Sequence, residues 1–270
     1  MKTNAVNMIG MNALAIALAA NTFAAGLAAD NAADSAYNDG WQTGDNGGTG
    51  WGGGWSLSTS VPPDVNKAGQ FVGSSQGNGF SDGNIDTAGR AWGEYANNTY
   101  IATATRPFNG ALSIGQTFSI DIDNGFLDSG SSVGFTLTGF GDPGATDQFS
   151  FFFQGGSSNY KVSVGRFVWY SETDTGVGFT SKGVHVEFTL TGSTSYSVAI
   201  TPNGASTTVL TGNMVISSPI DHVELYNYNA GTGSANDAFF NNIAIVPEPT
   251  TAMLVGAGLV SMIALRRRRS

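Results

Sequence analysis

Two aspartates, Asp121 and Asp123, have the type and spacing that could support acid–base chemistry on a sugar. They lie in a stretch where apolar and polar residues alternate, so a strand would place both carboxylates on one face. Retaining glycosidases need two carboxyl groups about 5–5.5 Å apart, and α-carbons two residues apart on a strand are roughly 6–7 Å apart. A Glu-x-Asp-x-x-Glu strand is absent, however, and the glutamates of the body are isolated: Glu94, Glu172, Glu187 and Glu224. We therefore favour a solvated strand face and expect no catalytic residue.

Other catalytic patterns are missing as well. The sequence contains no nucleophile elbow, P-loop, HExxH or dinucleotide fingerprint. Its two histidines, His185 and His222, lie in different predicted strands without neighbours at metal-binding spacing. We expect a non-enzymatic protein.

Oxygen-bearing side chains at two places in the sequence could hold a calcium ion. Asp39, Asp45 and Asn46 lie in a glycine-rich segment near the start of the body, and Asp237 precedes its last predicted strand. Calcium takes carboxylate and amide oxygens from flexible turns. If the first and last strands pair, these residues could converge on a structural Ca²⁺, although Asp and Asn also cap turns through their own backbone. No other cofactor is expected.

Aromatic residues offer a second kind of binding site. Exposed rings stack on the faces of sugars, and Trp92, Trp169 and Tyr226 are the candidates for such a site. The alternative is that these rings fill the space between two sheets, where aromatic side chains bury the most apolar area. Both interpretations stay open at this point.

The elements that would position these residues are strands. About a dozen segments with period-two alternation are separated by glycine-rich turns, from Trp55 to Ile245. No helical periodicity lies between the two ends of the chain. The pattern predicts an all-β fold, an antiparallel β-sandwich of jelly-roll type, as one domain over residues 30–246.

Charge limits the partners of this domain. It carries six basic and nineteen acidic residues, a net charge of −13, whereas the whole 270-residue chain has −9. Nucleic-acid binding needs clustered Lys and Arg and is excluded. The absence of cysteine makes the fold independent of the redox state of its compartment.

The N-terminus is typical of a secretory signal. Residues 1–29 hold Lys2 as their only charge, an apolar stretch and small residues, and the acidic body begins at Asp30. We expect a signal helix that signal peptidase removes by cleavage between Ala24 and Ala29.

The C-terminus joins three parts in a fixed order within residues 247–270. Pro247, Glu248 and Pro249 hold the chain extended, an apolar run at 250–265 predicts a single transmembrane helix, and Arg266, Arg267, Arg268 and Arg269 stop translocation. This order resembles the PEP-CTERM sorting signal of Gram-negative bacteria. The resemblance implies that an exosortase processes the tail, so that the protein is anchored transiently in the cytoplasmic membrane and then reaches the cell surface or the extracellular space. A plain, unprocessed membrane anchor is the alternative.

The body resembles the lectin-like ectodomains, of concanavalin or laminin-G type, found among PEP-CTERM proteins. The residues that carry this resemblance are Asp39–Trp41, the stretch 110–121 and the stretch 236–243. The resemblance implies an exported surface or matrix protein associated with extracellular polysaccharide or biofilm. A carbohydrate-binding module is the alternative function, and a glycoside hydrolase is a third hypothesis, which requires a groove flanked by two carboxylates.

Overall fold

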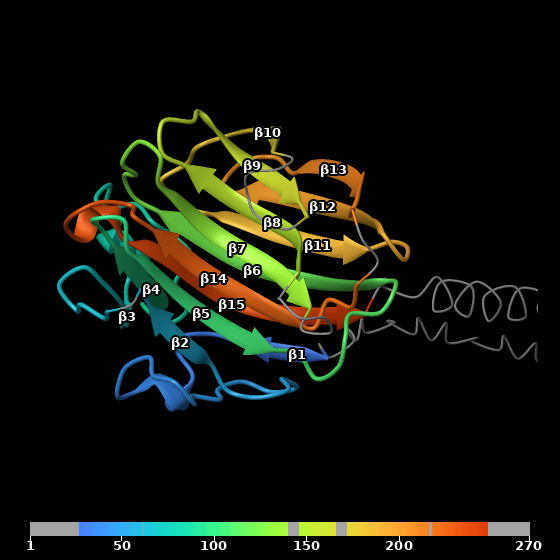
Figure 1. Ribbon diagram of the computed structural model, residues 1–270, viewed down its shortest axis with the longest axis horizontal. Coiled ribbons are helices and arrows are strands. Elements are labelled where there is room, and N and C mark those ends of the chain that lie inside the picture. The colour runs from blue at the N-terminus through green and yellow to red at the C-terminus, as the bar shows by residue number, and fades with distance from the viewer. Residues whose placement is uncertain (1–26, 61, 140–145, 166–171, 216–217, 248–270) are drawn as a thin grey trace, which may run out of the picture.

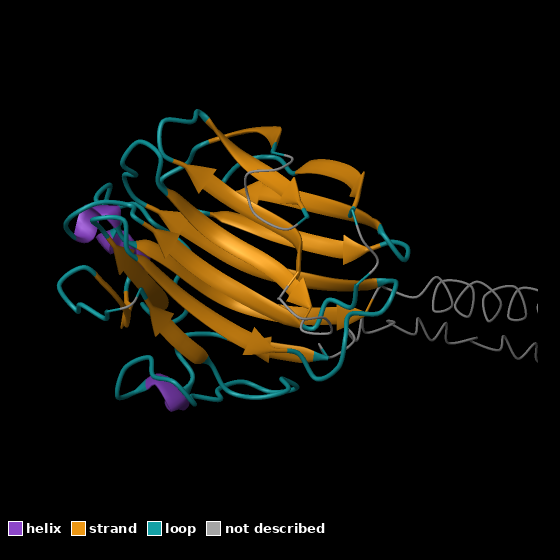
Figure 2. Ribbon diagram, in the orientation of Figure 1, coloured by secondary structure: helices purple, strands orange, loops and turns teal. Residues whose placement is uncertain are grey.

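The computed structural model describes residues 27–247, except for 61, 140–145, 166–171 and 216–217. Within this part the chain forms two antiparallel sheets that pack face to face, as Figures 1 and 2 show. The predicted all-β sandwich is therefore confirmed. Among the described residues no helix is long and apolar enough to cross a bilayer, and the predicted signal and transmembrane helices lie outside them.

One sheet has eight strands in the order β13-β12-β11-β6-β15-β4-β3, with β1 beside β15. Their bounds are β1 Ala28–Asp30, β3 Ala68–Gly73, β4 Ala91–Ala96, β6 Gln116–Asn124, β11 Val184–Leu190, β12 Ser195–Pro202, β13 Thr208–Asn213 and β15 Ala238–Pro247.

The other sheet has seven strands in the order β10-β9-β8-β7-β14-β5-β2. These are β2 Ser56–Thr59, β5 Ile101–Pro107, β7 Ser132–Gly139, β8 Thr146–Gln154, β9 Asn159–Val164, β10 Thr173–Gly178 and β14 His222–Tyr228. Three short 3₁₀ turns lie in the connections: η1 Ser35–Tyr37, η2 Ser75–Gly77 and η3 Ser234–Asn236.

Alternating apolar side chains from both sheets fill the space between them. In β6, Phe118, Ile120 and Ile122 are buried in the core, as the period-two pattern predicts. Phenylalanines of β7 and β8 meet them, and the rings of Phe118 and Phe135 lie 5.5 Å apart between centroids. Burial of these large rings provides the main driving force for folding.

The first and last strands lie side by side. Ala28 and Asp30 of β1 pair with Ile245 and Ile243 of β15, and the Leu27 N–H donates to the Ile245 carbonyl at 2.7 Å. The first half of β15 instead pairs with β4. β1 therefore continues the sheet edge where β4 ends, and the two ends of the described chain lie at the same end of the sandwich (Figure 1).

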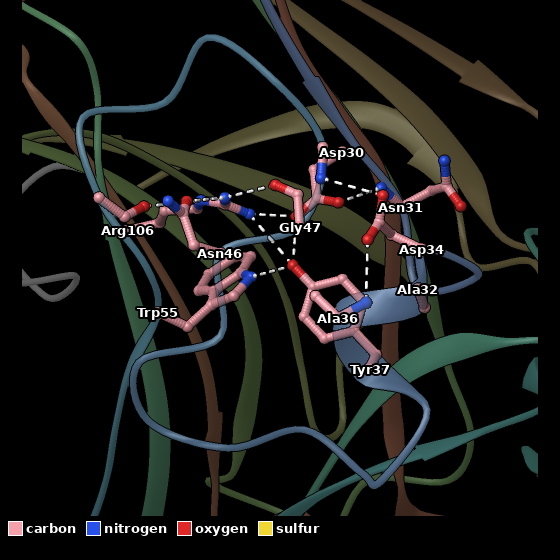
Figure 3. Close-up of polar contacts among 12 residues, drawn as sticks. Asp30, Asn31, Ala32, Asp34, Ala36, Tyr37, Asn46, Gly47, Trp55 and Arg106 are labelled. Carbon is pink, nitrogen blue, oxygen red and sulfur yellow. Dashed lines mark hydrogen bonds and ion pairs between the residues drawn. The ribbon is translucent and has the colours of Figure 1, made fainter.

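A buried ion pair holds the glycine-rich segment that follows β1 (Figure 3). The Arg106 guanidinium of β5 contacts the Asp30 carboxylate, and both side chains are fully buried. The same guanidinium donates to the Gly47 carbonyl at 2.8 Å and to Asn46 Oδ1 at 3.0 Å. Glycine is required beside this pair, because a Cβ on Gly48, at φ +68°, would lie 2.0 Å from the Ala29 carbonyl oxygen.

Candidate functional site

A cavity of about 360 Å³ opens on the outer face of the seven-stranded sheet. Its lining combines two tyrosine rings, two hydroxyl-bearing side chains, two carboxyl groups and one aliphatic side chain: Ile101, Ser132, Thr136, Asp147, Glu224, Tyr226 and Tyr228. Strands β5, β7, β8 and β14 contribute these residues. An open, partly aromatic cavity with several polar groups is suited to a hydroxyl-rich ligand.

Strand alternation places three of these side chains in the cavity. Val223 and Leu225 of β14 point into the core between the sheets. Glu224, Tyr226 and Tyr228 therefore face outward along the same strand. The hydrogen-bonding register sets Glu224 between Thr105 of β5 and Thr136 of β7.

Asp147 reaches the cavity through a β-bulge. Phe149 is opposite Leu137, but Asp147 is opposite Thr138, so Gln148 is an extra residue in β8. In a regular strand Asp147, two residues before Phe149, would share the inward orientation of Phe149. The bulge turns its side chain to the outer face, where Glu224 lies.

The two carboxyl groups influence each other. Burial raises the pKa of Glu224, and the charge of Asp147 raises it further. The Thr105 hydroxyl opposes this shift through a long hydrogen bond of 3.4 Å to Glu224 Oε2. Proximity of like charges in a partly dry site therefore favours the protonated form of Glu224.

Tyr226 lines the same cavity, but its hydroxyl oxygen is buried. Its side chain is only 5% exposed, and burial raises the pKa of its hydroxyl. The Ser132 side chain opposes this shift, but the hydroxyl makes no hydrogen bond of normal geometry within the described residues. A buried hydroxyl in this state lowers the stability of the fold, because its hydrogen bonds to water are not replaced.

A further carboxyl group is buried between the two sheets. Glu94 of β4 has the same orientation as Trp92, toward the core, and is fully buried. Neither of its carboxylate oxygens has a hydrogen-bonding partner among the described residues. Burial raises the pKa of Glu94 well above its usual range, and the charge of Glu224 adds to that shift. Burial therefore favours the protonated form of Glu94, which lies within electrostatic range of Glu224.

The structure separates the three predicted sugar-binding aromatics. Tyr226 lines the cavity. Trp92 is fully buried, with its ring 5.3 Å from those of Tyr37 and Trp55, so the interpretation of Trp92 as a stacking platform was wrong and the core interpretation holds. Trp169 lies outside the described residues.

The predicted calcium ligands have other partners. Asp45 Oδ2 accepts from the Gln42 N–H at 2.7 Å, and Asn46 accepts from Arg106. Asp39 lies in the same segment, where its carbonyl accepts from the Gln42 side chain. Across the described ranges no group of three or more His, Cys, Asp or Glu could hold a metal ion.

Asp237 is also away from that segment. The terminal strands do pair, as expected, but Asp30 is opposite Ile243, whereas Asp237 precedes the other end of β15. Burial raises the pKa of Asp237 to about 7. The strand pairing therefore does not bring Asp237 to the glycine-rich segment, and calcium binding stays a prediction.

Asp121 and Asp123 have different partners and form no shared site. Asp121 binds His185 Nδ1 at 2.6 Å and the Asn242 amide at 2.7 Å. Asp123 is fully buried and accepts from the Asn78 amide at 3.0 Å.

Sequence reasoning missed Asp147 and described Glu224 as isolated. Glu224 could have been placed on the outer face from its position between Val223 and Leu225. No signal in the sequence indicates the bulge at Gln148, so the pairing of the two carboxyl groups required the tertiary structure.

The chain carries a PEP-CTERM protein-sorting motif, whose family matches residues 246–269. Pro247 ends β15 and is opposite Gln116; Glu248, Pro249 and Arg266 to Arg269 lie outside the described residues. The motif marks the chain as an exported protein with a membrane-anchored sorting signal.

No curated protein matches the sequence. Among solved structures, a conserved carbohydrate esterase from Shiga toxin-encoding bacteriophage phi24B is 15% identical, with a TM-score of 0.48, over 83% of this chain and 99% of its own. A legume lectin-like domain from Entamoeba histolytica is 11% identical, with a TM-score of 0.44, over 68% and 91%. The family 11 carbohydrate-binding module from Clostridium thermocellum, solved in complex with a mixed-linked tetrasaccharide, is 11% identical, with a TM-score of 0.35, over 72% and 89%.

Proposed function

We propose that this exported protein is processed by an exosortase and binds polysaccharide at the cell surface or in the extracellular matrix of a Gram-negative bacterium, without cleaving it. The observation that carries the binding role is the cavity on the seven-stranded sheet. It sets the partly exposed ring of Tyr228 beside carboxyl and hydroxyl groups, a combination suited to stacking on a sugar face and to hydrogen bonding with sugar hydroxyls. The sorting motif supports the location.

The proposal can be tested with the extracellular polysaccharide of the bacterium that produces the protein. The full chain is run in native gels that contain this polysaccharide, and the decrease in its mobility measures the affinity. Tyr228→Ala is expected to weaken binding at least tenfold, because loss of a stacked ring removes about 1.4 kcal/mol or more. Tyr95→Ala, on a strand of the other sheet, is the matched control. Equal binding by wild type and Tyr228→Ala would exclude this cavity as the site.

Glycoside hydrolysis is a second candidate function, and the carboxyl pair favours it. Glu224, with its raised pKa, would protonate the leaving oxygen, and Asp147 would act as the partner carboxylate. Release of reducing ends from the same polysaccharide separates the two functions. Hydrolysis that disappears in both Glu224→Gln and Asp147→Asn would replace the non-enzymatic proposal.

A further inference from the structure

We infer that one end of the sandwich is a membrane-contact surface, which lies on the lipid headgroups of the bilayer that holds the sorting signal. The inference rests on the membrane anchoring that the sorting motif indicates, and it is independent of polysaccharide binding. The surface is formed by three connections between strands, at residues 108–115, 191–194 and 214–220 without 216–217. We call it the tail-end surface, because the chain leaves its last strand beside it.

Backbone pairing brings these three connections to the end of β15. The last residue of β15 is opposite the first residue of β6. The Gly115 N–H, just before β6, donates to the Leu190 carbonyl at the end of β11, at 2.7 Å. The Leu112 N–H donates to the Ile220 carbonyl at 2.8 Å and so joins the first connection to the third. The tail-end surface therefore lies at the end of the sandwich where the described chain begins and ends (Figure 1).

Exposed aliphatic side chains on this surface indicate an apolar partner. Ile114 and Val215 are 64% and 68% exposed. The strands next to them, β6 and β13, are three strand spacings apart in the sheet, or roughly 14 Å. Large aliphatic side chains that a folded domain leaves in water mark a contact with another apolar phase. At this separation the two side chains can enter one bilayer interface together.

Charge distinguishes the tail-end surface from the rest of the body. It contains no Asp, Glu, Lys or Arg, although the body carries −13. The charged residue next to it in the sequence, Asp221, binds His222 at 2.6 Å. Connections at the opposite end of the strands hold Asp128, Lys182 and Asp237. Anionic lipids give a membrane surface a negative potential, so an acidic domain approaches it most favourably through an uncharged end.

The length of chain beyond β15 sets how near this end lies to the bilayer. Only Glu248 and Pro249 separate Pro247 from the apolar run that begins at residue 250. This connection spans at most about 11 Å. The headgroup layer between water and hydrocarbon is roughly 5–8 Å thick. When the apolar run lies in the hydrocarbon, the tail-end surface is therefore at or next to the headgroups.

Fluorescence quenching by lipids tests the inference. The chain has no cysteine, so a fluorophore on a single introduced cysteine reports on one position. The full chain with Ile114→Cys is reconstituted in vesicles of phosphatidylethanolamine and phosphatidylglycerol that contain a phosphatidylcholine spin-labelled close to its headgroup. Phe126→Cys is the matched control, because Phe126 is 53% exposed and follows the other end of β6, whose nine residues span roughly 30 Å. We expect the label of Ile114→Cys to lose about half of its fluorescence or more, and that of Phe126→Cys to lose less than about a tenth.

A spacer variant separates binding by the surface from simple tethering. About twelve Gly and Ser residues, with an end-to-end distance of roughly 20 Å, are inserted after Pro247. Quenching of the Ile114→Cys label should persist in this variant, because the tether keeps the local concentration of lipid high and a weak contact suffices. Adding Val215→Asp should then reduce the quenching about threefold or more, since a carboxylate opposes insertion. Val65→Asp, at a position 79% exposed beyond the opposite end of β2, should leave it unchanged.

Three results would overturn the inference. The first is equal quenching at Ile114→Cys and Phe126→Cys, and the second is loss of quenching when the spacer is inserted. The third is quenching of the spacer variant only when exosortase is present in the vesicles, which would assign the surface to the enzyme. Failure of the full chain to float with the vesicles would contradict the membrane anchoring and the inference with it. Polysaccharide binding is measured separately and does not depend on any of these results.

Discussion

Replacement of Arg106 by methionine should destabilise the protein by several kcal/mol. Methionine fills a similar volume, but it leaves the Asp30 carboxylate buried without its counter-ion. It also removes hydrogen bonds to Asn46 at 3.0 Å, to Gly47 at 2.8 Å and to the Tyr37 hydroxyl at 3.2 Å. Breaking a buried ion pair by removing one partner costs about 3–5 kcal/mol.

The tryptophan rings next to this guanidinium allow the loss to be measured. Trp51 and Trp55 have ring centroids 4.8 and 5.2 Å from the Arg106 guanidinium carbon, so fluorescence reports on this region. With a urea dependence of about 3 kcal/mol per molar, a loss of about 4 kcal/mol lowers the unfolding midpoint by roughly 1.3 M. Combining Arg106→Met with Asp30→Leu should restore part of this loss, because no unpaired charge then stays buried.

Arg90→Met is the matched control for this experiment. Arg90 also binds the segment after β1, through Asn38 at 3.0 Å, but its side chain is partly exposed. Its loss should lower the free energy of unfolding by less than about 1 kcal/mol. If Arg106→Met shifts the midpoint no more than Arg90→Met does, the buried pair is not what holds this segment in place.

Three further predictions concern pH and the two ends of the chain. Burial raises the pKa of Asp123 from 3.8 to about 8, so the folded state binds a proton more tightly than the unfolded chain, and stability should fall as pH rises from about 4 to 8. Asp123→Asn should remove up to roughly 4 kcal/mol of that fall between pH 4 and 7, measured as unfolding midpoints in urea; an unchanged pH profile would contradict the assignment. N-terminal sequencing of the exported protein should show cleavage before Ala28, because Ala28 pairs with Ile245; a mature chain that begins at Asp30 would show that β1 is dispensable. Mass spectrometry of the mature C-terminus should find no peptide containing Arg266; intact arginines there would indicate a plain membrane anchor.

Strands that have one apolar face could be predicted from the alternation of apolar and polar residues in the sequence. β11 and β12 follow this rule, since their buried residues alternate with more exposed ones. β3 and β4 show no such alternation in the sequence, because glycine, alanine and polar residues interrupt their apolar pattern. In β4 the core-facing positions are Trp92, Glu94 and Ala96, and a buried carboxyl group at such a position breaks the binary pattern.

The candidate site was predictable only in part. Tyr226 was singled out as an aromatic residue in a predicted strand, and it does line the cavity. Trp92 was chosen on the same grounds and lies in the core, because the alternation of β4 turns it inward against Tyr37 and Trp55. Residue type alone does not distinguish a ring that faces a ligand from one that fills a core.

The sequence by itself determined the sandwich class, the acidic body and the sorting motif, because each depends on local composition, local periodicity or a contiguous pattern. Only the tertiary structure decided which carboxyl groups meet. Glu224 and Asp147 are 77 positions apart in the sequence, and they share a cavity because β14 pairs with β7, β7 pairs with β8, and a bulge at Gln148 reverses the face on which Asp147 lies. Strand order and register are set by packing across the whole domain, and one extra residue in a strand is enough to change which side chains form a site.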